Sequence, residues 1–135
     1  MDQYFPLVTK MSTARATGEI PQSNRQFGKA IAEFQLIQAM LADSKAESYA
    51  ARTMVFDAAR KKEAGENITL EAACAKMFAT EAAANICEKT ARIFASYGYA
   101  MEYPVQRFLR DVRFMLIGGG TSDILKLIIA KELST

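Results

Sequence analysis

Apolar side chains recur at steps of three and four residues along two long stretches of this sequence. The first stretch starts at Ile31 or Glu33 and ends at about Ala64, with charged residues interleaved. This spacing predicts one amphipathic helix near thirty residues, roughly 45 Å long. The second stretch begins near Thr69, which we expect to be its N-cap, and continues through Phe94. Its dense alanine content favours close approach of a neighbouring helix.

The link between these two predicted helices is short and contains Gly65, a residue suited to the left-handed helix cap. Two long helices joined in this way pack antiparallel. Two shorter helices are predicted downstream, from Val105 to Phe114 and from Ile124 to Leu133. The last has few polar positions, so we expect it to be buried on most sides, against the bundle or another subunit. The sequence therefore predicts an all-α fold, an antiparallel helical bundle.

Composition restricts the class of protein. The chain has 135 residues, half of them hydrophobic, which is enough for one domain with one core. Its 17 basic and 15 acidic residues give a net charge of +2, which indicates neither a nucleic-acid partner nor an anionic membrane. No apolar run approaches the roughly 20 residues of a membrane span, and the N-terminus lacks a secretory pattern. We expect a cytoplasmic protein, or a mitochondrial matrix protein in a eukaryote.

The sequence contains no histidine. This absence excludes Ser/His/Asp and Cys/His nucleophile systems and most zinc sites. The two cysteines, Cys74 and Cys87, lie thirteen residues apart on one predicted helix, nearly on opposite faces, so they cannot pair with each other. We expect two buried free thiols and no metal site.

Three glycines at positions 118–120 lead into Thr121, Ser122 and Asp123. A glycine turn that enters a hydroxyl-capped helix leaves backbone N–H groups at the positive end of the helix dipole, an arrangement that binds anions such as a pyrophosphate. The alternative is an ordinary tight turn, because any helix can be entered through this combination of residues.

The short helix before this turn carries several charges. Asp111 lies four residues after Arg107, so an ion pair along the helix is predicted, worth a few tenths of a kcal/mol. We expect these charges to have a structural role.

Several short sequence motifs occur in a defined order along the chain. They are Arg25-Gln26-Phe27-Gly28-Lys29, Phe34-Gln35, Gly98-Tyr99, Glu102-Tyr103-Pro104-Val105-Gln106-Arg107, Arg110-Asp111-Val112-Arg113 and Gly120-Thr121-Ser122-Asp123-Ile124. In this order they resemble the C-terminal helical domain of the acyl-CoA dehydrogenase family. The resemblance covers residues 24–135, and residues 1–23 are expected to form a divergent N-terminal helix and loop.

The resemblance implies a flavin-dependent enzyme that introduces a double bond between the α and β carbons of an acyl-CoA thioester. It implies FAD as cofactor, shared with other domains or subunits in a homo- or hetero-oligomer. A partner chain would carry the missing N-terminal and β domains, and an electron-transfer flavoprotein would accept the electrons. The implied cofactor-binding residues are Arg25, Gln26, Phe27, Gln35, Gly120, Thr121, Ser122 and Asp123. Gly119 and Gly120 are the implied substrate-binding residues.

Several positions depart from the family pattern. Gly119 stands where many members place the catalytic glutamate, so we predict no catalytic residue in this chain. Asn24 replaces an arginine, and Arg92, Ala95 and Ser96 replace the glutamine and two glycines of a cofactor-contacting turn. Two interpretations follow. One is a C-terminal domain or split subunit that contributes cofactor contacts and oligomer packing. The other is a non-catalytic helical interaction module with a decayed flavin site.

Overall fold

The computed structural model describes residues 25–134, so the expectations for residues 1–23 and for Asn24 lie outside the described part. Four α-helices account for most of the described residues, which confirms the predicted all-α class. The elements in chain order are β1 Arg25–Gln26, β2 Lys29–Ala30, the 3-10 turn η1 Ile31–Glu33, α3 Gln35–Glu63, α4 Thr69–Phe94, the 3-10 turn η2 Ala95–Gly98, α5 Val105–Met115 and α6 Ser122–Leu133. Within residues 25–134, no helix has the length and apolar character needed to cross a membrane.

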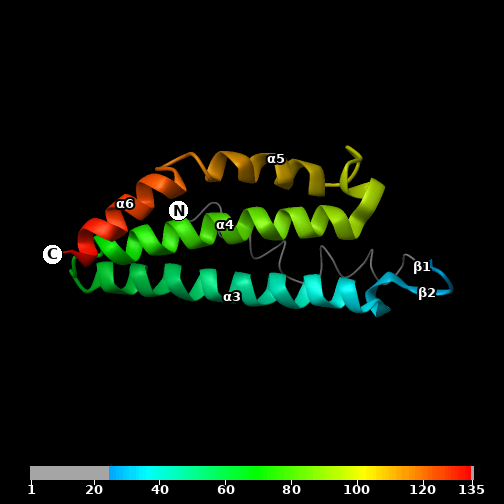
Figure 1. The fold of residues 1–135 in the computed structure, drawn as a ribbon, viewed down its shortest axis with the longest axis horizontal. Coiled ribbons are helices and arrows are strands. Elements are labelled where there is room, and N and C mark those ends of the chain that lie inside the picture. Colours follow the sequence, from blue (N-terminus) through cyan, green and yellow to red (C-terminus); the bar gives the residue numbers. More distant parts are fainter. Residues whose placement is uncertain (1–24, 135) are drawn as a thin grey trace.

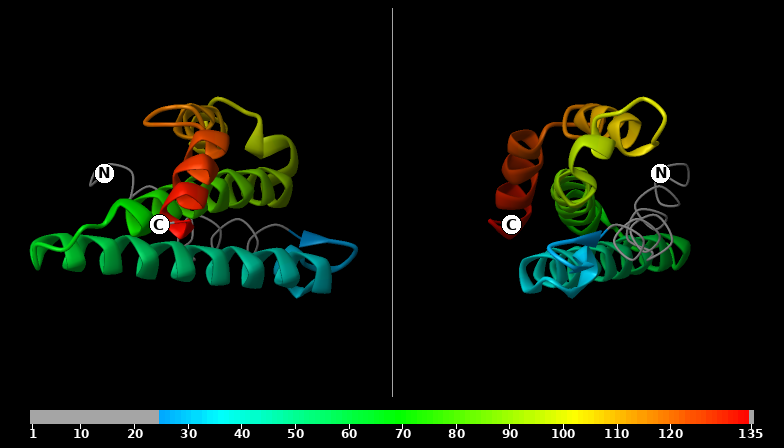
Figure 2. Two further views of the ribbon diagram at one scale, coloured as in Figure 1. Left: turned by 60° about the vertical axis from the view of Figure 1, so that its left-hand side comes forward. Right: turned by 90° about the vertical axis from the view of Figure 1, so that its right-hand side faces the viewer.

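The helix α4 is the centre of the bundle, since it packs against α3, α5 and α6. The helices α3 and α4 lie side by side and antiparallel, as predicted (Figure 1). The chain then reverses at η2, and α5 runs back along the side of α4 that faces away from α3. The small hairpin of β1 and β2 extends beyond the end of the bundle where α3 begins (Figures 1 and 2).

The turn between α3 and α4 is built from local hydrogen bonds. Gly65 has φ +81°, and its N–H donates to the Lys62 carbonyl (3.0 Å) while the Glu66 N–H donates to Lys61 (3.1 Å). This is the Schellman arrangement that a left-handed glycine permits, so the predicted helix end is confirmed. The predicted N-cap is wrong: Thr69 is the first residue of α4, and the Asn67 side chain accepts hydrogen bonds from the Thr69 N–H (3.2 Å) and hydroxyl (2.8 Å).

Two clusters of buried side chains form the core. One joins α4 to α5 through Ala83, Ile86, Cys87 and Val112. The other gathers Ile31, Ile93, Phe94 and Val105 at the end of the bundle near η2. The buried residues of α3 are small, and they are Ser44, Ser48, Ala51 and Ala58. Four alanines are among the buried residues of α4, so small side chains on both helices favour their close approach.

Neither Cys74 nor Cys87 forms a disulfide within residues 25–134. Cys87 is buried, and burial raises the pKa of its thiol to about 12, whereas Cys74 is only half-buried. The expectation of two buried thiols is therefore correct for Cys87 alone, because Cys74 lies on a less covered face of α4.

Two expectations for the C-terminal third are corrected. Leu125 is the single buried residue of α6, while Leu127 is 67% exposed and Leu133 is 73% exposed. The bundle covers only the side of α6 that faces α4, so this chain does not bury the helix on most sides, and burial against another subunit stays a prediction. Within the described residues, the predicted ion pair between Arg107 and Asp111 does not form, and the Arg107 guanidinium lies 5.3 Å from the centre of the Phe108 ring instead.

Candidate functional site

The glycine turn between α5 and α6 has the open geometry predicted for an anion site. Gly119 and Gly120 adopt φ of +73° and +105°, values that favour glycine. A Cβ placed on Gly119 would meet no protein atom within 4 Å, so the backbone at this point faces free space. Thr121 is the N-cap of α6, and its hydroxyl oxygen accepts the Ile124 N–H (3.3 Å).

Two charged side chains of α4 hold this turn, and neither was predicted from the sequence. The Lys76 ammonium donates to the carbonyl of Met115 (3.2 Å) and to that of Gly120. The Ser122 hydroxyl donates to the carboxylate of Glu81. In the sequence, Lys76 and Glu81 stand out only as charged residues within an alanine-rich helix. That pattern does not reveal which groups they contact.

The electrostatics at the head of α6 combine attraction and repulsion. The N-terminal turn of a helix presents unpaired N–H groups at its positive end. The Asp123 carboxylate lies in that same turn and would repel an anion, but it is paired with the Lys126 ammonium at 3.0 Å. This exposed pair leaves the dipole of α6 and the Lys76 ammonium as the local attractions for an anion, and the Glu81 carboxylate bonded to Ser122 opposes them.

The second predicted group of cofactor residues lies in the hairpin at the start of the described chain. Phe27 and Gly28 form its loop with φ of +51° and +83°, and the Arg25 guanidinium donates to the Gly28 carbonyl (2.7 Å). A phenylalanine seldom adopts a left-handed backbone conformation. The Phe27 side chain is also 94% exposed, so burial of the ring does not stabilise this conformation. Its ring contacts Phe34 edge to face, with ring centres 6.4 Å apart. The loop therefore presents an aromatic ring to the outside.

The structure does not bring the two groups together. The hairpin lies beyond one end of the bundle, next to Gln35 at the start of α3 (Figure 1). The glycine turn lies between α5 and α6, on the other side of α4 from α3 (Figures 1 and 2). A single copy of the described chain therefore leaves each group exposed and encloses no ligand between them.

The corner where α4 ends carries the altered family positions. Ala95 has φ +52° and ψ −129°, a conformation that favours glycine. Gly98, three residues later, is buried against α4: a Cβ there would lie 2.5 Å from the Ala91 carbonyl oxygen. Ala95 thus has a backbone conformation suited to glycine. At position 98, the close approach of η2 to α4 leaves room only for glycine.

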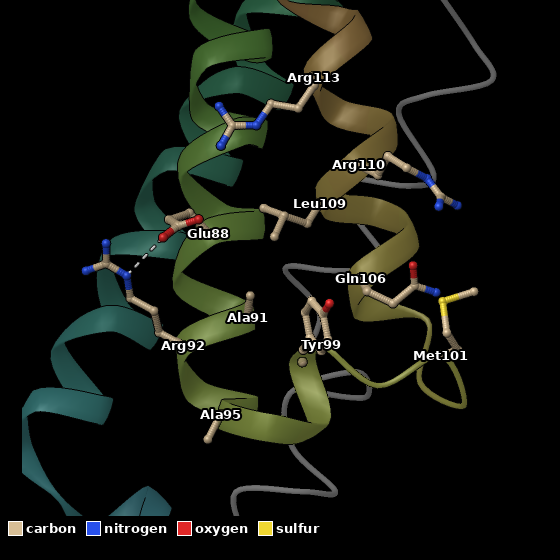
Figure 3. Close-up of a pocket in the computed structure, with 11 residues that line it drawn as sticks. Glu88, Ala91, Arg92, Ala95, Tyr99, Met101, Gln106, Leu109, Arg110 and Arg113 are labelled. Atoms are coloured by element: carbon tan, nitrogen blue, oxygen red, sulfur yellow. Dashed lines mark hydrogen bonds and ion pairs between the residues drawn. The ribbon is translucent and has the colours of Figure 1, made fainter.

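A groove of about 750 Å³ opens beside this corner, between α4, η2 and α5 (Figure 3). Its floor includes Ala91 and Leu109, and three arginines lie around it. These arginines do not converge. Arg92 is paired with Glu88 at 3.1 Å and points away from α5, while Arg110 points away from α4 (Figure 3). The predicted cofactor residues do not line this groove.

Replacing Ala95 by glycine is expected to raise the free energy of unfolding by up to about 2 kcal/mol. With positive φ and ψ of −129°, Ala95 lies in a sparsely populated backbone conformation that costs of order 1–3 kcal/mol, and the greater freedom of glycine in the unfolded chain offsets part of the gain. Urea unfolding of both proteins measures the difference. As a control, Ala59→Gly on the exposed side of α3 should lower stability by about 1 kcal/mol. A less stable Ala95→Gly protein would contradict the strain at this corner.

The fit of a flavin dinucleotide can be judged from these features. The glycine turn offers free space, left-handed glycines and a helix N-terminus, which together suit a diphosphate. The exposed ring of Phe27 suits stacking on a planar group. The corner at Ala95 and Ser96 is exposed and keeps a glycine-like backbone, although two side chains are added. The glycine turn and the hairpin therefore fit such a group.

Comparison with known proteins gives a consistent result. The sequence pattern described as "Acyl-CoA dehydrogenase, C-terminal domain" matches residues 8–134. A benzylmalonyl-CoA dehydrogenase of Aromatoleum aromaticum is 61% identical over 111 residues, which are 82% of this chain and 29% of that protein. A short-chain specific acyl-CoA dehydrogenase of Megasphaera elsdenii is 39% identical over 82% of this chain and 29% of its own length.

Solved structures agree. The butyryl-CoA dehydrogenase of Megasphaera elsdenii superposes with a TM-score of 0.92 at 34% identity, covering 98% of this chain and 34% of its own. An FAD complex of PigA superposes with a TM-score of 0.92 at 27% identity, covering 97% of this chain and 34% of that one. FAD is the cofactor of this family. By sequence pattern, identity and fold, this chain belongs to the acyl-CoA dehydrogenase family and corresponds to the C-terminal domain of its members.

Proposed function

We propose that this chain is the C-terminal helical part of an FAD-dependent acyl-CoA dehydrogenase and supplies cofactor contacts and oligomer packing. The chain spans less than a third of the length of the benzylmalonyl-CoA dehydrogenase relative, so it does not complete the reaction by itself. When bound, FAD supplies the acceptor for the hydride that leaves the β carbon of an acyl-CoA thioester. The observation that carries the proposal is the open, left-handed glycine turn leading into the Thr121-capped helix.

Each residue group has a defined task in this proposal. Gly120, Thr121, Ser122 and Asp123 hold the diphosphate through the backbone at the head of α6, and Gly119 with Gly120 borders the thioester. The hairpin residues Arg25, Gln26 and Phe27, with Gln35 behind them, contact a cofactor held mainly by another copy or a partner chain. The distance between the hairpin and the turn in the fold supports this division. Since Gly119 has no side chain, the catalytic carboxylate comes from elsewhere.

The partners follow from this incompleteness. A partner chain, or a further part of the same protein, provides the missing domains, and an electron-transfer flavoprotein accepts the electrons. Among the relatives, one is named as the CarC subunit of a caffeyl-CoA reductase–Etf complex, 40% identical over 81% of this chain. That name supports the electron acceptor by analogy alone.

The alternative is a non-catalytic helical interaction module. Arg92 supports it, because the arginine that replaces the family glutamine is engaged with Glu88. The exposed apolar residues of α6 support it equally, since they offer a surface for another protein. This alternative predicts oligomer formation without any bound flavin.

The deciding experiment is purification with added FAD, alone and mixed with candidate chains that carry the missing domains. We expect stoichiometric flavin absorbance only in a productive mixture. The variant Gly119→Ala should reduce flavin retention about tenfold, because its methyl group would enter the open space beside the Gly120–Thr121 backbone proposed to hold the diphosphate, where no protein atom lies within 4 Å. Gly65→Ala is the matched control: it has a similar φ of +81° and an equally open Cβ position, but lies between α3 and α4.

The outcomes separate the two candidates. Loss of flavin in Gly119→Ala with retention in Gly65→Ala supports the cofactor site. Equal loss in both variants attributes the effect to backbone strain and contradicts a role for the glycine turn. Failure of every wild-type mixture to retain flavin, with oligomers still present, supports the non-catalytic module.

A further inference from the structure

We infer that Lys76 is a positioning residue that sets the direction of the Gly120–Thr121 peptide, so that the Thr121 N–H faces out of the protein toward an anionic ligand. This inference rests on the proposed cofactor role of the glycine turn. Lys76 lies on α4, more than forty residues before that turn, and its side chain is half-buried. Lys76 is not part of any of the sequence motifs on which the family resemblance rests.

The first step of the argument is the position of the ammonium group. Lys76 Nζ donates to the carbonyl of Met115, the last residue of α5, and to the carbonyl of Gly120, which precedes the N-cap of α6. The last carbonyls of a helix lack partners and form its negative end, so a cation is favoured there. One ammonium therefore joins the end of α5 to the start of α6.

The second step is the geometry of the peptide bond. The described peptides are all trans, and a planar trans peptide directs its C=O and its N–H to opposite sides. Because the Gly120 carbonyl points to Lys76 on α4, the N–H of Thr121 points away from α4. The open side of the turn, where a Cβ on Gly119 would meet no protein atom, is the free space beside this backbone.

The third step is the freedom of the glycines. Gly119 and Gly120 populate positive and negative φ about equally well, so the turn alone does not select one direction for this peptide. A rotated peptide would present the Gly120 carbonyl oxygen to the ligand and repel an anion. Glu81 holds the Ser122 side chain, one residue beyond Thr121, and leaves the direction of the Gly120 carbonyl to Lys76.

The test compares Lys76→Met, Lys76→Arg and the control Lys89→Met in the full chain. Lys89 is also a half-buried lysine of α4, but it bonds Glu47 of α3 (2.8 Å), so its removal affects the bundle and not the turn. Amide hydrogen exchange is measured at Gly118, which donates to Phe114, and at Leu125, which donates to Thr121. We expect Lys76→Met to speed exchange at both amides about tenfold beyond any global change, and Lys76→Arg to restore the wild-type rates.

Ligand binding is then followed by NMR titration with ADP as the diphosphate probe. In the wild-type chain we expect shifts of the Thr121, Ser122 and Asp123 amides. Lys76→Met should weaken this binding about tenfold, whereas Lys76→Arg and Lys89→Met should bind within about threefold of wild type. If Lys76→Met does not fold, Lys76→Gln, which keeps a single amide donor, takes its place in both measurements.

Four results are decisive. Exchange at Gly118 and Leu125 that changes equally in the Lys76 and Lys89 variants overturns the positioning role, and so does undiminished ADP binding by Lys76→Met. Faster exchange without ADP shifts in any protein, the wild type included, keeps Lys76 as the brace of the turn but overturns the proposed cofactor contact. Loss of both properties with recovery in Lys76→Arg supports the inference.

Discussion

Replacing Gly98 by alanine is expected to lower the free energy of unfolding by about 3 kcal/mol. The added Cβ would lie 2.5 Å from the Ala91 carbonyl oxygen and 3.0 Å from the Ala91 Cα, both atoms of the α4 backbone. A flexible side chain could rotate away, but a helix backbone in a packed bundle moves only with its neighbours. Overpacking of this kind costs roughly 1–3 kcal/mol, and contact with backbone places Gly98→Ala at the upper end. Urea unfolding followed by circular dichroism measures the change.

The control for this prediction is Gly65→Ala. That position has φ +81° but open space around the added Cβ, so we expect a loss of roughly 1–2 kcal/mol from conformation alone. Gly98→Ala should therefore be the more destabilising substitution. If Gly98→Ala lowered the free energy of unfolding less than Gly65→Ala, η2 would move away from α4 at little cost. The close approach of η2 to α4 would then no longer explain the glycine at position 98.

Replacing Ile86 by alanine is expected to lower the free energy of unfolding by about 3–4 kcal/mol. Ile86 is 1% exposed and packs with Ala83, Cys87 and Val112 where α4 meets α5. Truncation of a buried isoleucine removes apolar contacts and leaves a cavity that surrounding helices fill only in part, which costs roughly 2–5 kcal/mol. The alanines nearby are too small to fill the space.

Ile117→Ala is the matched control, because Ile117 is 66% exposed in the turn after α5. For the single chain we expect a change within about 0.5 kcal/mol. Both variants are measured by urea unfolding at several protein concentrations. A loss at Ile117 similar to that at Ile86 would show that another copy or protein covers this exposed residue, and the effect should then depend on protein concentration.

The helices could be predicted from the sequence because their physics is local. Apolar spacing fixed α3 and α4 to within a few residues, and Gly65 marked the end of α3 correctly. The start of α4 was placed near Thr69, but the N-cap is Ile68, and the Asn67 side-chain oxygen accepts the Thr69 N–H and hydroxyl. The residue that caps a helix depends on side-chain geometry across two or three neighbouring residues. Residue type alone does not specify that geometry.

The candidate site was predicted only in part, since its second half depends on tertiary contacts. The glycine turn was expected from residues 118–123, and its open, left-handed backbone agrees with an anion site. The bonds from Lys76 and Glu81 span 39 to 44 residues of sequence and require the packing of α4 against the turn. The sequence left open whether the bundle or another subunit covers α6 for a related reason: its apolar composition does not say which neighbour covers each side.

The separation of the hairpin from the glycine turn has a consequence for inheritance and for mixed assemblies. In a twofold symmetric pair each copy would lend its hairpin to the other, so every complete site would draw on two polypeptides. A pair made of one copy with a defective hairpin and one with a defective glycine turn would then contain one site with both defects and one with neither. Two inactive alleles could complement each other in the same cell, and half of the sites in each mixed pair would work.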